Sequence, residues 1–531
     1  MEIIDKKRTN KELKLGIILS YFLIAINISS GFILVPLIID GIGKSNYGLY
    51  SAASSLITMF IVDLGLGTAI TKFISKYRVT SNEEQINKLV SVVFYCFLAL
   101  SIFLLIIFII LFQFLDLLYS SFTVAEIESF KVVFLMVASY SVLTFPFGIV
   151  NGILVAYDKI FWSKIADIIS KVAFIILTII VLKMRLGLYF LTACYAVHGL
   201  LCIALKILFV KAKTPCHFFN KMTFFEFKKM FKEVASFSIW AAINSFGRVL
   251  LVSFAPSILG FVSSAGQGSK EIALFSIAAQ MESYVSLFAT SFGSIFYPTV
   301  SRVLFFHGEP DEMAFLKFQD FHIKIARIQV LILAIIILGF FMCGKEFIYL
   351  WVGDGYEKAY YCVLIICTPA LFFYPLQTAE NAIAAIERIK YCGISTILST
   401  VIGIIASVVF GFLLGSIGVS LGICIGFLTR TILFNLCFKK FLKINSFLFY
   451  FKSYFSFIIP MAFIVVAGIF LNYLFPAYSL LSFLLKILTI SIVYLFFVCV
   501  FGLNENEKSI IDIRFKKIFK RVNAFLGELE K

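Results

Sequence analysis

Residues 15–39 read LGIILSYFLIAINISSGFILVPLII, an apolar run without a charged side chain. A helix of this length can cross the roughly 30 Å hydrocarbon core of a bilayer. Backbone groups in lipid must satisfy their own hydrogen bonds, which favours a helix here. The run follows a basic start that includes Lys6, Lys7 and Arg8. It is too long for the apolar part of a signal peptide and lacks a small-residue cleavage site, so we expect a retained first membrane helix.

Similar runs recur along the whole chain. The 531 residues are 61% hydrophobic and 14% charged, whereas a soluble protein carries about 25% charged residues. We therefore predict an all-α polytopic membrane protein with about fourteen transmembrane helices. The expected spans are 15–39, 47–70, 89–118, 132–157, 165–182, 186–210, 234–259, 272–297, 325–343, 360–383, 392–414, 417–438, 454–475 and 480–503.

Short sequence matches between the two halves indicate an internal duplication. Residues 25–27 (AIN) recur at 242–244, residues 49–53 (LYSAA) at 274–278 (LFSIA), and a Pro and Asn-x-Ile motif at 145–153 recurs at 374–383. The offsets (244−27=217, 274−49=225, 381−151=230) rise in chain order, as loop insertions would make them. Chance similarity between apolar helices is the alternative. The implied architecture is two pseudo-symmetric six-helix lobes and two C-terminal helices.

The connections between the expected helices alternate between basic and charge-poor. Because loop Lys and Arg concentrate on the cytoplasmic side, we place both termini in the cytoplasm. The net charge of +16 then faces anionic membrane lipids, and nucleic acid is not needed to explain it. The expected organisation is a cytoplasmic N-terminus (1–14), a first lobe (15–210), a basic cytoplasmic linker (211–233), a second lobe (234–438), helices 13 and 14 (439–503) and a basic tail (504–531).

Ionisable side chains inside the expected spans are candidates for function, because each costs about 2.5–3.5 kcal/mol at mid-membrane and usually faces a cavity. For Lys206, Arg430 and Lys486 we instead expect positions near helix ends, from which a long side chain reaches the interface. Asp167 and Lys171 are spaced i, i+4 and can neutralise each other on one helix face.

Small and polar residues form stripes in helices 1, 2, 7 and 8, the equivalent helices of the two lobes. Such stripes indicate a water-filled central cavity, although they also occur where membrane helices pack tightly. Arg248 lies in the middle of helix 7 and is the expected main contact for an anionic cargo; a buried salt bridge with Glu282 is the alternative. The expected substrate-binding residues are Arg248, Asn244, Asn27, Gln280 and Lys171. The expected ion-coupling residues are Asp63, Glu282 and Glu380.

The sequence gives no sign of catalysis, a cofactor or a metal. It contains no phosphate-binding loop, nucleophile elbow or zinc motif, and the connections are too short for a soluble catalytic domain. The 11 cysteines lie almost entirely inside apolar runs, where they act as small apolar residues.

Several short motifs resemble the polysaccharide and O-antigen flippases of the multidrug, oligosaccharidyl-lipid and polysaccharide exporter superfamily. Residues 43–50 (GKSNYGLY) are similar to the family's L-G-x-x-x-Y-G-x-Y, and residues 63–67 (DLGLG) to its D-L-G-L segment. Lys72 stands where the family commonly has arginine. Tyr297-Pro298, Ser301-Arg302 and the 351–356 segment (WVGDGY) are also typical of these proteins.

This resemblance implies a transporter of the bacterial cytoplasmic membrane that flips an undecaprenyl-pyrophosphate-linked oligosaccharide by alternating access. Such a flippase serves O-antigen or capsule synthesis beside a polysaccharide polymerase and a chain-length regulator. Arginine would suit the pyrophosphate, which it can bind with two parallel hydrogen bonds. The intramembrane charges of this chain are mixed rather than plainly cationic, which is a departure from that pattern.

Two other functions remain open at this point. A drug or cation antiporter of the same superfamily would use acidic residues such as Glu282 and Glu380. An integral-membrane polymerase or glycosyltransferase would usually carry a long outer loop, and the outer connections expected here are short.

Overall fold

The computed structural model describes residues 2–60, 66–79, 83–220, 222–305, 311–475, 479–505 and 507–508. Every regular element in these ranges is a helix, which confirms the predicted all-α fold. Twelve of the helices are long and apolar enough to cross a membrane. The predicted second and seventh spans are not among the twelve, so the total of fourteen stays a prediction.

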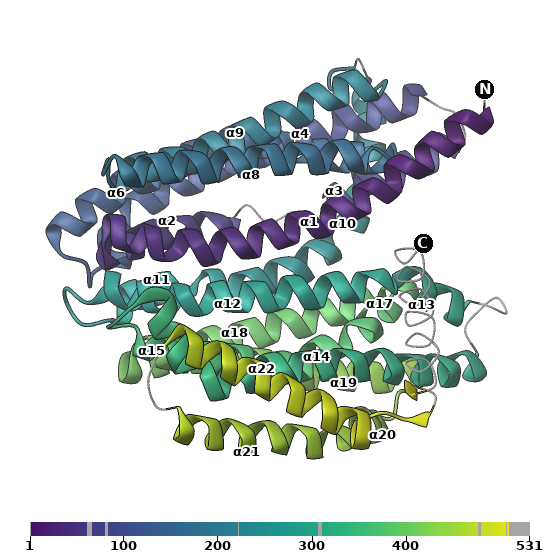
Figure 1. Ribbon diagram of the computed structural model, residues 1–531. Coiled ribbons are helices and arrows are strands. Elements are labelled where there is room, and N and C mark those ends of the chain that lie inside the picture. Colours follow the sequence, from purple (N-terminus) through teal and green to yellow (C-terminus); the bar gives the residue numbers. More distant parts are fainter. Residues whose placement is uncertain are drawn as a thin grey trace, which may run out of the picture.

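The helices form two groups, which we call the first and second lobe (Figure 1). The first lobe consists of α1 (Glu2–Ile42), α2 (Lys44–Phe60), α3 (Leu66–Val79), α4 (Glu83–Gln113), α5 (Leu115–Leu118), α6 (Val124–Thr144), α7 (Ile149–Ala156), α8 (Ile160–Lys183) and α9 (Leu188–Lys213). The second lobe consists of α10 (Phe224–Ser253), α11 (Ala255–Val262), α12 (Gly268–Ile295), α13 (Tyr297–Leu304), α14 (Glu312–Val352), α15 (Glu357–Cys367), α16 (Ala370–Phe373), α17 (Gln377–Ala385), α18 (Ile389–Leu414) and α19 (Ser416–Leu442).

The remaining helices, α20 (Ser446–Tyr454), α21 (Ile458–Leu474) and α22 (Leu480–Phe497), pack on the second lobe through α14. The start of α1 and the end of α22 lie on the same side of the molecule (Figure 1). We call this side the inner end and the opposite side, with the loops at 114–123 and 263–267, the outer end. That the start of α1 and the end of α22 share one end is compatible with the predicted topology, whereas the assignment of this end to the cytoplasm rests on the loop charges.

Two equivalent helices are kinked at equivalent places. A 3₁₀ turn at Phe145–Gly148 joins α6 to α7, and a 3₁₀ turn at Tyr374–Leu376 joins α16 to α17. Pro146 and Pro375 stand in these turns, where a proline interrupts the α-helical hydrogen-bond ladder because it lacks an N–H. The kinks therefore follow directly from the duplicated proline motif.

Both kinked helices also end in the same tight turn. Asp158 and Glu387 each have a φ of 59°, in the left-handed region. In the first turn Lys159 N donates to the carbonyl of Leu154 at 2.8 Å. In the second turn Arg388 N donates to the carbonyl of Ile383 at 2.9 Å. This hydrogen bond is typical of a helix C-terminus that reverses direction. The repeated turn supports the interpretation that the chain arose by duplication.

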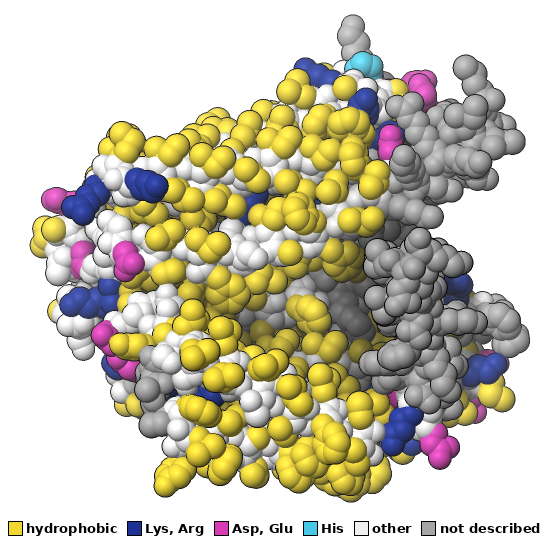
Figure 2. Space-filling model, in the orientation of Figure 1, with side chains coloured by type: hydrophobic (Ala, Val, Ile, Leu, Met, Phe, Trp, Pro, Cys, Tyr) yellow, Lys and Arg dark blue, Asp and Glu magenta, His cyan; other side chains and the backbone are white. Residues whose placement is uncertain are grey.

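The surface fits a membrane environment. Figure 2 shows hydrophobic side chains across the middle of the visible face, with Lys, Arg, Asp and Glu mainly at the two ends. Many large apolar residues of the outward helix faces are more than half exposed, among them Ile102 and Phe103 of α4, Ile405 of α18 and Phe470 of α21. Such exposure is expected where lipid rather than water covers the helices.

Candidate functional site

A cavity of about 460 Å³ lies between the two lobes. Helices α2 and α12 provide most of its wall, and α10, α11, Tyr195 and Phe427 complete it. Its volume falls in the range of about 300–1,000 Å³ that is usual for ligand sites. More than half of the described lining side chains carry a hydroxyl group: Tyr47, Tyr50, Ser51, Ser54, Ser55, Thr58, Tyr195, Ser253, Ser276, Ser283 and Ser286.

Helical spacing explains why these hydroxyls face the cavity. Ser51, Ser55 and Thr58 recur every three or four residues in α2, as Ser276 and Ser283 do with Gln280 between them in α12, so each set occupies one helix face. The predicted polar stripes of helices 2 and 8 therefore line a cavity in the structure. The polar content of α2 also explains why it is less apolar than the twelve candidate spans.

Contacts between the lobes close the outer end of this cavity. The Oγ atoms of Ser51 and Ser276 lie 2.5 Å apart, and those of Ser45 and Ser269 lie 2.8 Å apart. One carboxylate oxygen of Glu126 accepts hydrogen bonds from both Ser45, at 2.7 Å, and Ser269, at 2.5 Å. A first-lobe carboxylate thus bridges the starts of α2 and α12.

Glu126 is a residue that the sequence reasoning missed. It stands in the first turn of α6, outside the predicted span 132–157, so it was not counted among the intramembrane charges. The signal was present, because Thr123 and Glu126 have the spacing of a capping box. The structure shows this box, with Glu126 N donating to Thr123 Oγ1 at 3.3 Å and Thr123 N donating to Glu126 at 2.9 Å.

Two of the predicted site residues, Gln280 and Glu282, line the cavity from α12. Glu282 accepts a hydrogen bond from the hydroxyl of Tyr374 at 3.2 Å. Asn27 lies in α1 and is not among the described residues that line the cavity. Its carbonyl accepts a hydrogen bond from Ser30 at 3.1 Å.

Three other predicted site residues cannot be placed at the level of side chains. Asp63 lies outside the described residues, and the side chains of Asn244 and Arg248 lie outside the described part of α10. The backbone of α10 puts positions 244 and 248 two turns and one turn before Val252, which lines the cavity.

Glu380, the third predicted ion-coupling residue, is paired with a cation. Arg430 lies 3.5 Å from the Glu380 carboxylate and is only 4% exposed. Its guanidinium carbon also lies near the rings of Phe373 and Phe434, at 4.4 and 4.7 Å from their centroids. The expectation that Arg430 reaches the interface was wrong, because the carboxylate and the two aromatic faces stabilise the charge inside the lobe.

The expected Asp167–Lys171 pair was also wrong. Asp167 binds Lys206 of α9 at 2.7 Å and Lys164 at 3.2 Å. Lys206, expected to reach the interface, is thereby held at the contact between α8 and α9. The physical reason is that helices pack side by side, so a partner on a neighbouring helix can lie closer than a partner one turn away.

Lys171 is left with aromatic neighbours. Its Nζ lies 5.3 Å from the ring centroid of Phe174. Phe174 in turn contacts His198 and Tyr195, and Tyr195 reaches the central cavity. Lys171 is therefore separated from the cavity by one aromatic layer.

Lys486 was expected to reach the interface and instead forms a fully buried ion pair. Its Nζ lies 2.7 Å from Glu346 of α14, and the two side chains are 2% and 3% exposed. A second pair joins the same two segments toward the inner end, where Arg327 binds Glu507 at 2.8 Å and the carbonyl of Gly502 at 2.6 Å. The C-terminal helix is thus attached to α14 near both ends.

Two apolar cavities lie beside α12, on the side facing α14. One, of about 500 Å³, is lined by α14 and α22, and the other, of about 270 Å³, by α1, α12 and α14. They share Phe32, Met281, Ile336 and Phe340. None of the described residues that line them is charged, so they suit a hydrocarbon.

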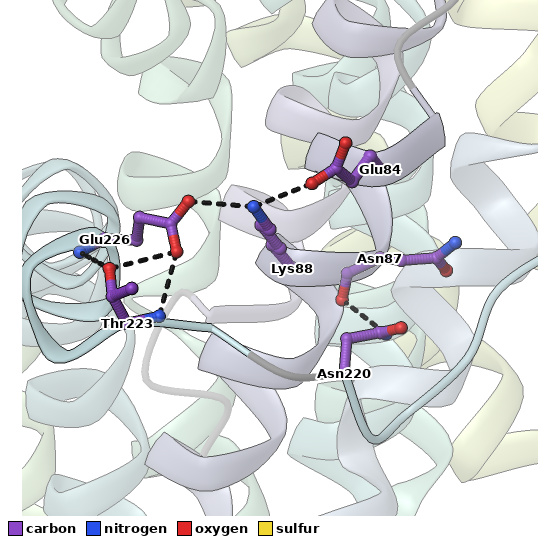
Figure 3. A network of polar contacts seen from close by, with 6 residues as sticks. All are labelled: Glu84, Asn87, Lys88, Asn220, Thr223 and Glu226. Carbon is purple, nitrogen blue, oxygen red and sulfur yellow. Dashed lines mark hydrogen bonds and ion pairs between the residues drawn. The ribbon is translucent and has the colours of Figure 1, made fainter.

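A polar network joins the two lobes at the inner end (Figure 3). Lys88 of α4 binds Glu84 and Glu226, each at 2.8 Å, and Glu226 also caps α10 through Thr223. Asn220, in the segment between α9 and α10, donates to the Asn87 carbonyl at 3.1 Å. The hydrogen bond that Glu226 accepts from Lys88 lowers the pKa of Glu226 from 4.5 to about 2. The start of α10 is thereby held on the first lobe.

Comparisons with known proteins give a family and a fold. The family model "Polysaccharide biosynthesis protein" matches residues 16–304. No curated protein matches the sequence. Among solved structures, the lipid II flippase MurJ in an inward closed conformation has a TM-score of 0.70 at 16% identity, covering 92% of this chain and 98% of that chain.

Multidrug transporters share the fold as well. An inward-facing multidrug resistance MATE family transporter of the MOP superfamily has a TM-score of 0.59 at 18% identity, covering 79% of this chain and 98% of its own. The Vibrio cholerae MATE transporter VcmN in its bent form has a TM-score of 0.54 at 13% identity, covering 82% and 98%. At these identities the likeness concerns the fold alone.

Proposed function

The chain belongs to the polysaccharide biosynthesis protein family, and from this premise we propose that it flips an undecaprenyl-pyrophosphate-linked oligosaccharide across the bacterial cytoplasmic membrane. The flippase and transporter fold of the chain is shared with MurJ and with MATE transporters. The proposed cargo would move from the inner to the outer leaflet by alternating access and would serve surface polysaccharide synthesis.

The two faces of α12 carry this proposal. Gln280 and Glu282 face the hydroxyl-lined cavity, whereas Met281 between them lines both apolar cavities. A cargo that fits both environments at once is amphiphilic, with a polar head and a long hydrocarbon chain. A lipid-linked oligosaccharide has this chemistry, because its sugars hydrogen-bond and its polyprenyl chain requires an apolar surface.

The pyrophosphate requires a cation. Arg248 is our candidate for its main contact, and Lys171, one aromatic layer behind the cavity, is the second. Asn244, Asn27 and Gln280 would add uncharged hydrogen bonds. A guanidinium suits a pyrophosphate because its planar set of N–H donors matches two phosphate oxygens.

Transport would be coupled to an ion gradient through a carboxylate. Of Asp63, Glu282 and Glu380, Glu282 is our leading candidate, because it lines the central cavity. Glu380 faces Arg430, and that pairing favours a structural role for this carboxylate. Glu282 would then bind a proton or a sodium ion when the cavity is open to one side of the membrane and release it when the cavity is open to the other side.

The proposed setting is the bacterial inner membrane with both termini in the cytoplasm. The lobe boundaries proposed from the sequence place the basic linker 211–233 and the basic tail 504–531 on that side, next to anionic lipids. A polysaccharide polymerase and a chain-length regulator are the proposed partners at the outer face, since they would consume the flipped cargo.

A vesicle assay tests the proposal. The purified protein is reconstituted into liposomes with the lipid-linked oligosaccharide of its host, and a membrane-impermeant glycosidase measures how fast the glycan crosses. We expect crossing to depend on the protein and to fall in Arg248→Ala, with Glu128→Gln as an exposed control. If the glycan crossed vesicles that contain the protein no faster than it crosses protein-free vesicles, the proposal would be contradicted.

The drug antiporter is the second candidate. It is favoured by Glu282, the one charged residue among the described residues that line the central cavity. In the same vesicles, a cationic dye driven by a proton gradient distinguishes the two functions. Extrusion of the dye without movement of the glycan would assign the protein to drug export.

A further inference from the structure

A second cavity lies inside the first lobe, apart from the path between the lobes. Its volume is about 630 Å³, and α3, α4, α6, α7 and α9 form its wall. The side chains that give it its chemistry are Thr71, Phe97, Tyr140, Thr144, Phe145 and Asn151. The described residues of its lining include none of the proposed pyrophosphate contacts and none of the proposed ion-coupling residues.

The described lining is part polar and part apolar, with the larger share of its surface apolar, and it is uncharged. None of the described residues that line this cavity is a Lys, Arg, Asp or Glu, so the cavity suits neither a pyrophosphate nor an ion. An amide, two threonine hydroxyls and a tyrosine hydroxyl distinguish this cavity from the two apolar cavities beside α12. The chemistry calls for a neutral ligand that is rich in hydroxyl groups.

The polar groups are oriented for such a ligand. Ser163 donates to the side-chain oxygen of Asn151 at 2.6 Å, which leaves the amide NH₂ of Asn151 as a donor. The hydroxyls of Thr71 and Thr144 donate to the carbonyls of Gly67 and Ser141, at 2.9 and 3.2 Å, so their oxygens remain acceptors. The cavity thus offers both donors and acceptors to hydroxyl groups.

Aromatic rings supply the other half of the chemistry. Phe97 and Phe145 meet edge to face with their centroids 5.4 Å apart, and Tyr140 adds a ring with a hydroxyl. Sugar rings have an apolar C–H face and a polar rim, and aromatic side chains with neighbouring amides and hydroxyls match both. Tyr140 can lie here because position 199 is a glycine, where a Cβ would collide with its ring.

The two cavities are neighbours. Tyr140 lines the first-lobe cavity and Tyr195 the central cavity, and their rings touch edge to face with centroids 5.7 Å apart. Each cavity falls in the size range of about 300–1,000 Å³ that holds one drug-sized group. An oligosaccharide repeat of several sugars therefore needs more room than the central cavity gives.

We propose that the first-lobe cavity is a carbohydrate subsite that takes the distal sugars of the oligosaccharide, while the pyrophosphate-linked sugar stays in the central cavity. This inference rests on the proposed function. Asn151, Tyr140, Thr71 and Thr144 then determine which glycans are transported, and Tyr140 and Tyr195 stand between the two compartments.

Two cargoes distinguish a failure of the proposed subsite from a failure of the proposed function. The first is the host's polyprenyl pyrophosphate with the complete repeat unit, and the second is the same lipid with only its first sugar. Both are reconstituted with wild type, Asn151→Ala, Tyr140→Phe and Asn381→Ala, the last being the matched position of the second lobe. Tyr140→Phe removes only the hydroxyl and keeps the packing of the ring. It therefore tests the subsite even if Asn151→Ala fails to fold.

We expect Asn151→Ala and Tyr140→Phe to slow the complete cargo about threefold to tenfold, the loss of one hydrogen bond, and to leave the single-sugar cargo unchanged. Asn381→Ala should move both cargoes at the wild-type rate. Equal losses on both cargoes, or no loss on either, would overturn the subsite.

If wild type moves neither cargo, the proposed function fails and the subsite is judged by binding alone. The probe is the free repeat-unit oligosaccharide of the host, titrated calorimetrically into the purified protein. Binding that Asn151→Ala weakens at least threefold would preserve the subsite, and absence of binding to wild type would reject it.

Discussion

Ser51 of α2 and Ser276 of α12 share a hydrogen bond of 2.5 Å between their Oγ atoms, and they occupy equivalent positions in the two repeats (276−51=225). Two equivalent residues can touch only where the axis that relates the lobes passes between them. Ser45 and Ser269, which are one position out of this register (269−45=224), lie 2.8 Å apart beside this contact and both donate to Glu126. The axis therefore runs through the contact that closes the outer end of the cavity, and separating α2 from α12 there would open the cavity outward.

A cross-link at this contact is expected to stop transport. Ser51→Cys with Ser276→Cys should form a disulfide under mild oxidation, because the two side chains already touch. Flipping should cease in the oxidised protein and return with a reductant. The single variants are the controls, since the chain has 11 native cysteines. Full activity of a completely cross-linked protein would show that the outer end opens elsewhere.

Glu126 is expected to set how easily the outer end opens. Glu126→Gln replaces the carboxylate that accepts from Ser45 and Ser269, and hydrogen bonds to a charged group contribute about 1.5–3 kcal/mol each. We expect a shift toward the outward-open state, read as faster labelling of a cysteine at Ser276 from outside. Glu128→Gln, on the exposed side of the same helix, should leave labelling unchanged.

The buried Glu346–Lys486 pair is expected to be essential for stability. Glu346→Ala leaves a buried lysine without a partner, which typically costs about 3–5 kcal/mol, and should lower the thermal unfolding temperature and the yield. Glu346→Leu combined with Lys486→Met should recover most of the loss. The exposed pair of Lys131 and Asp116 is the control, because such pairs contribute about 0–1 kcal/mol.

Substitution of Arg248 distinguishes a cargo contact from a structural ion pair. For a cargo contact, Arg248→Ala should lose flipping at a normal protein level, and Arg248→Lys should keep part of it because the charge remains while the planar fork is lost. For a buried pair with Glu282, Arg248→Ala should instead depress the level of folded protein. Normal flipping by Arg248→Ala would remove Arg248 from the mechanism.

The ion pair between Lys88 and Glu226 at the inner end is expected to stay intact across the physiological pH range. The pKa of Glu226 is lowered from 4.5 to about 2, so the stability it contributes is fully present above about pH 4.5 and is lost as the pH falls toward 2. Hydrogen exchange of residues 222–226 should therefore be constant from pH 8 to 5, after correction for the intrinsic rate. A transition near pH 6 that Glu226→Gln removes would contradict this.

The polar face of α12 shows what helix periodicity reveals. The spacing of Ser276, Gln280 and Ser283 predicts a common face, and that face lines the cavity. The repeated proline motifs at Pro146 and Pro375, which in the sequence indicated only a duplication, stand at equivalent kinks in the structure. The prediction from α12 succeeds because helix periodicity acts within a few residues of chain.

The sequence by itself determined that the chain is an all-α membrane protein, because long uncharged runs in lipid have no other way to satisfy their backbone. Only the tertiary structure decided the partners of the charges: Asp167 binds Lys206 rather than Lys171, and Arg430 and Lys486 are buried against Glu380 and Glu346. The first-lobe cavity also depends on five helices that are distant in sequence. A charge inside a membrane protein pairs with whatever the packing of helices brings within a few ångströms, and that packing is not encoded in the neighbouring residues of the chain.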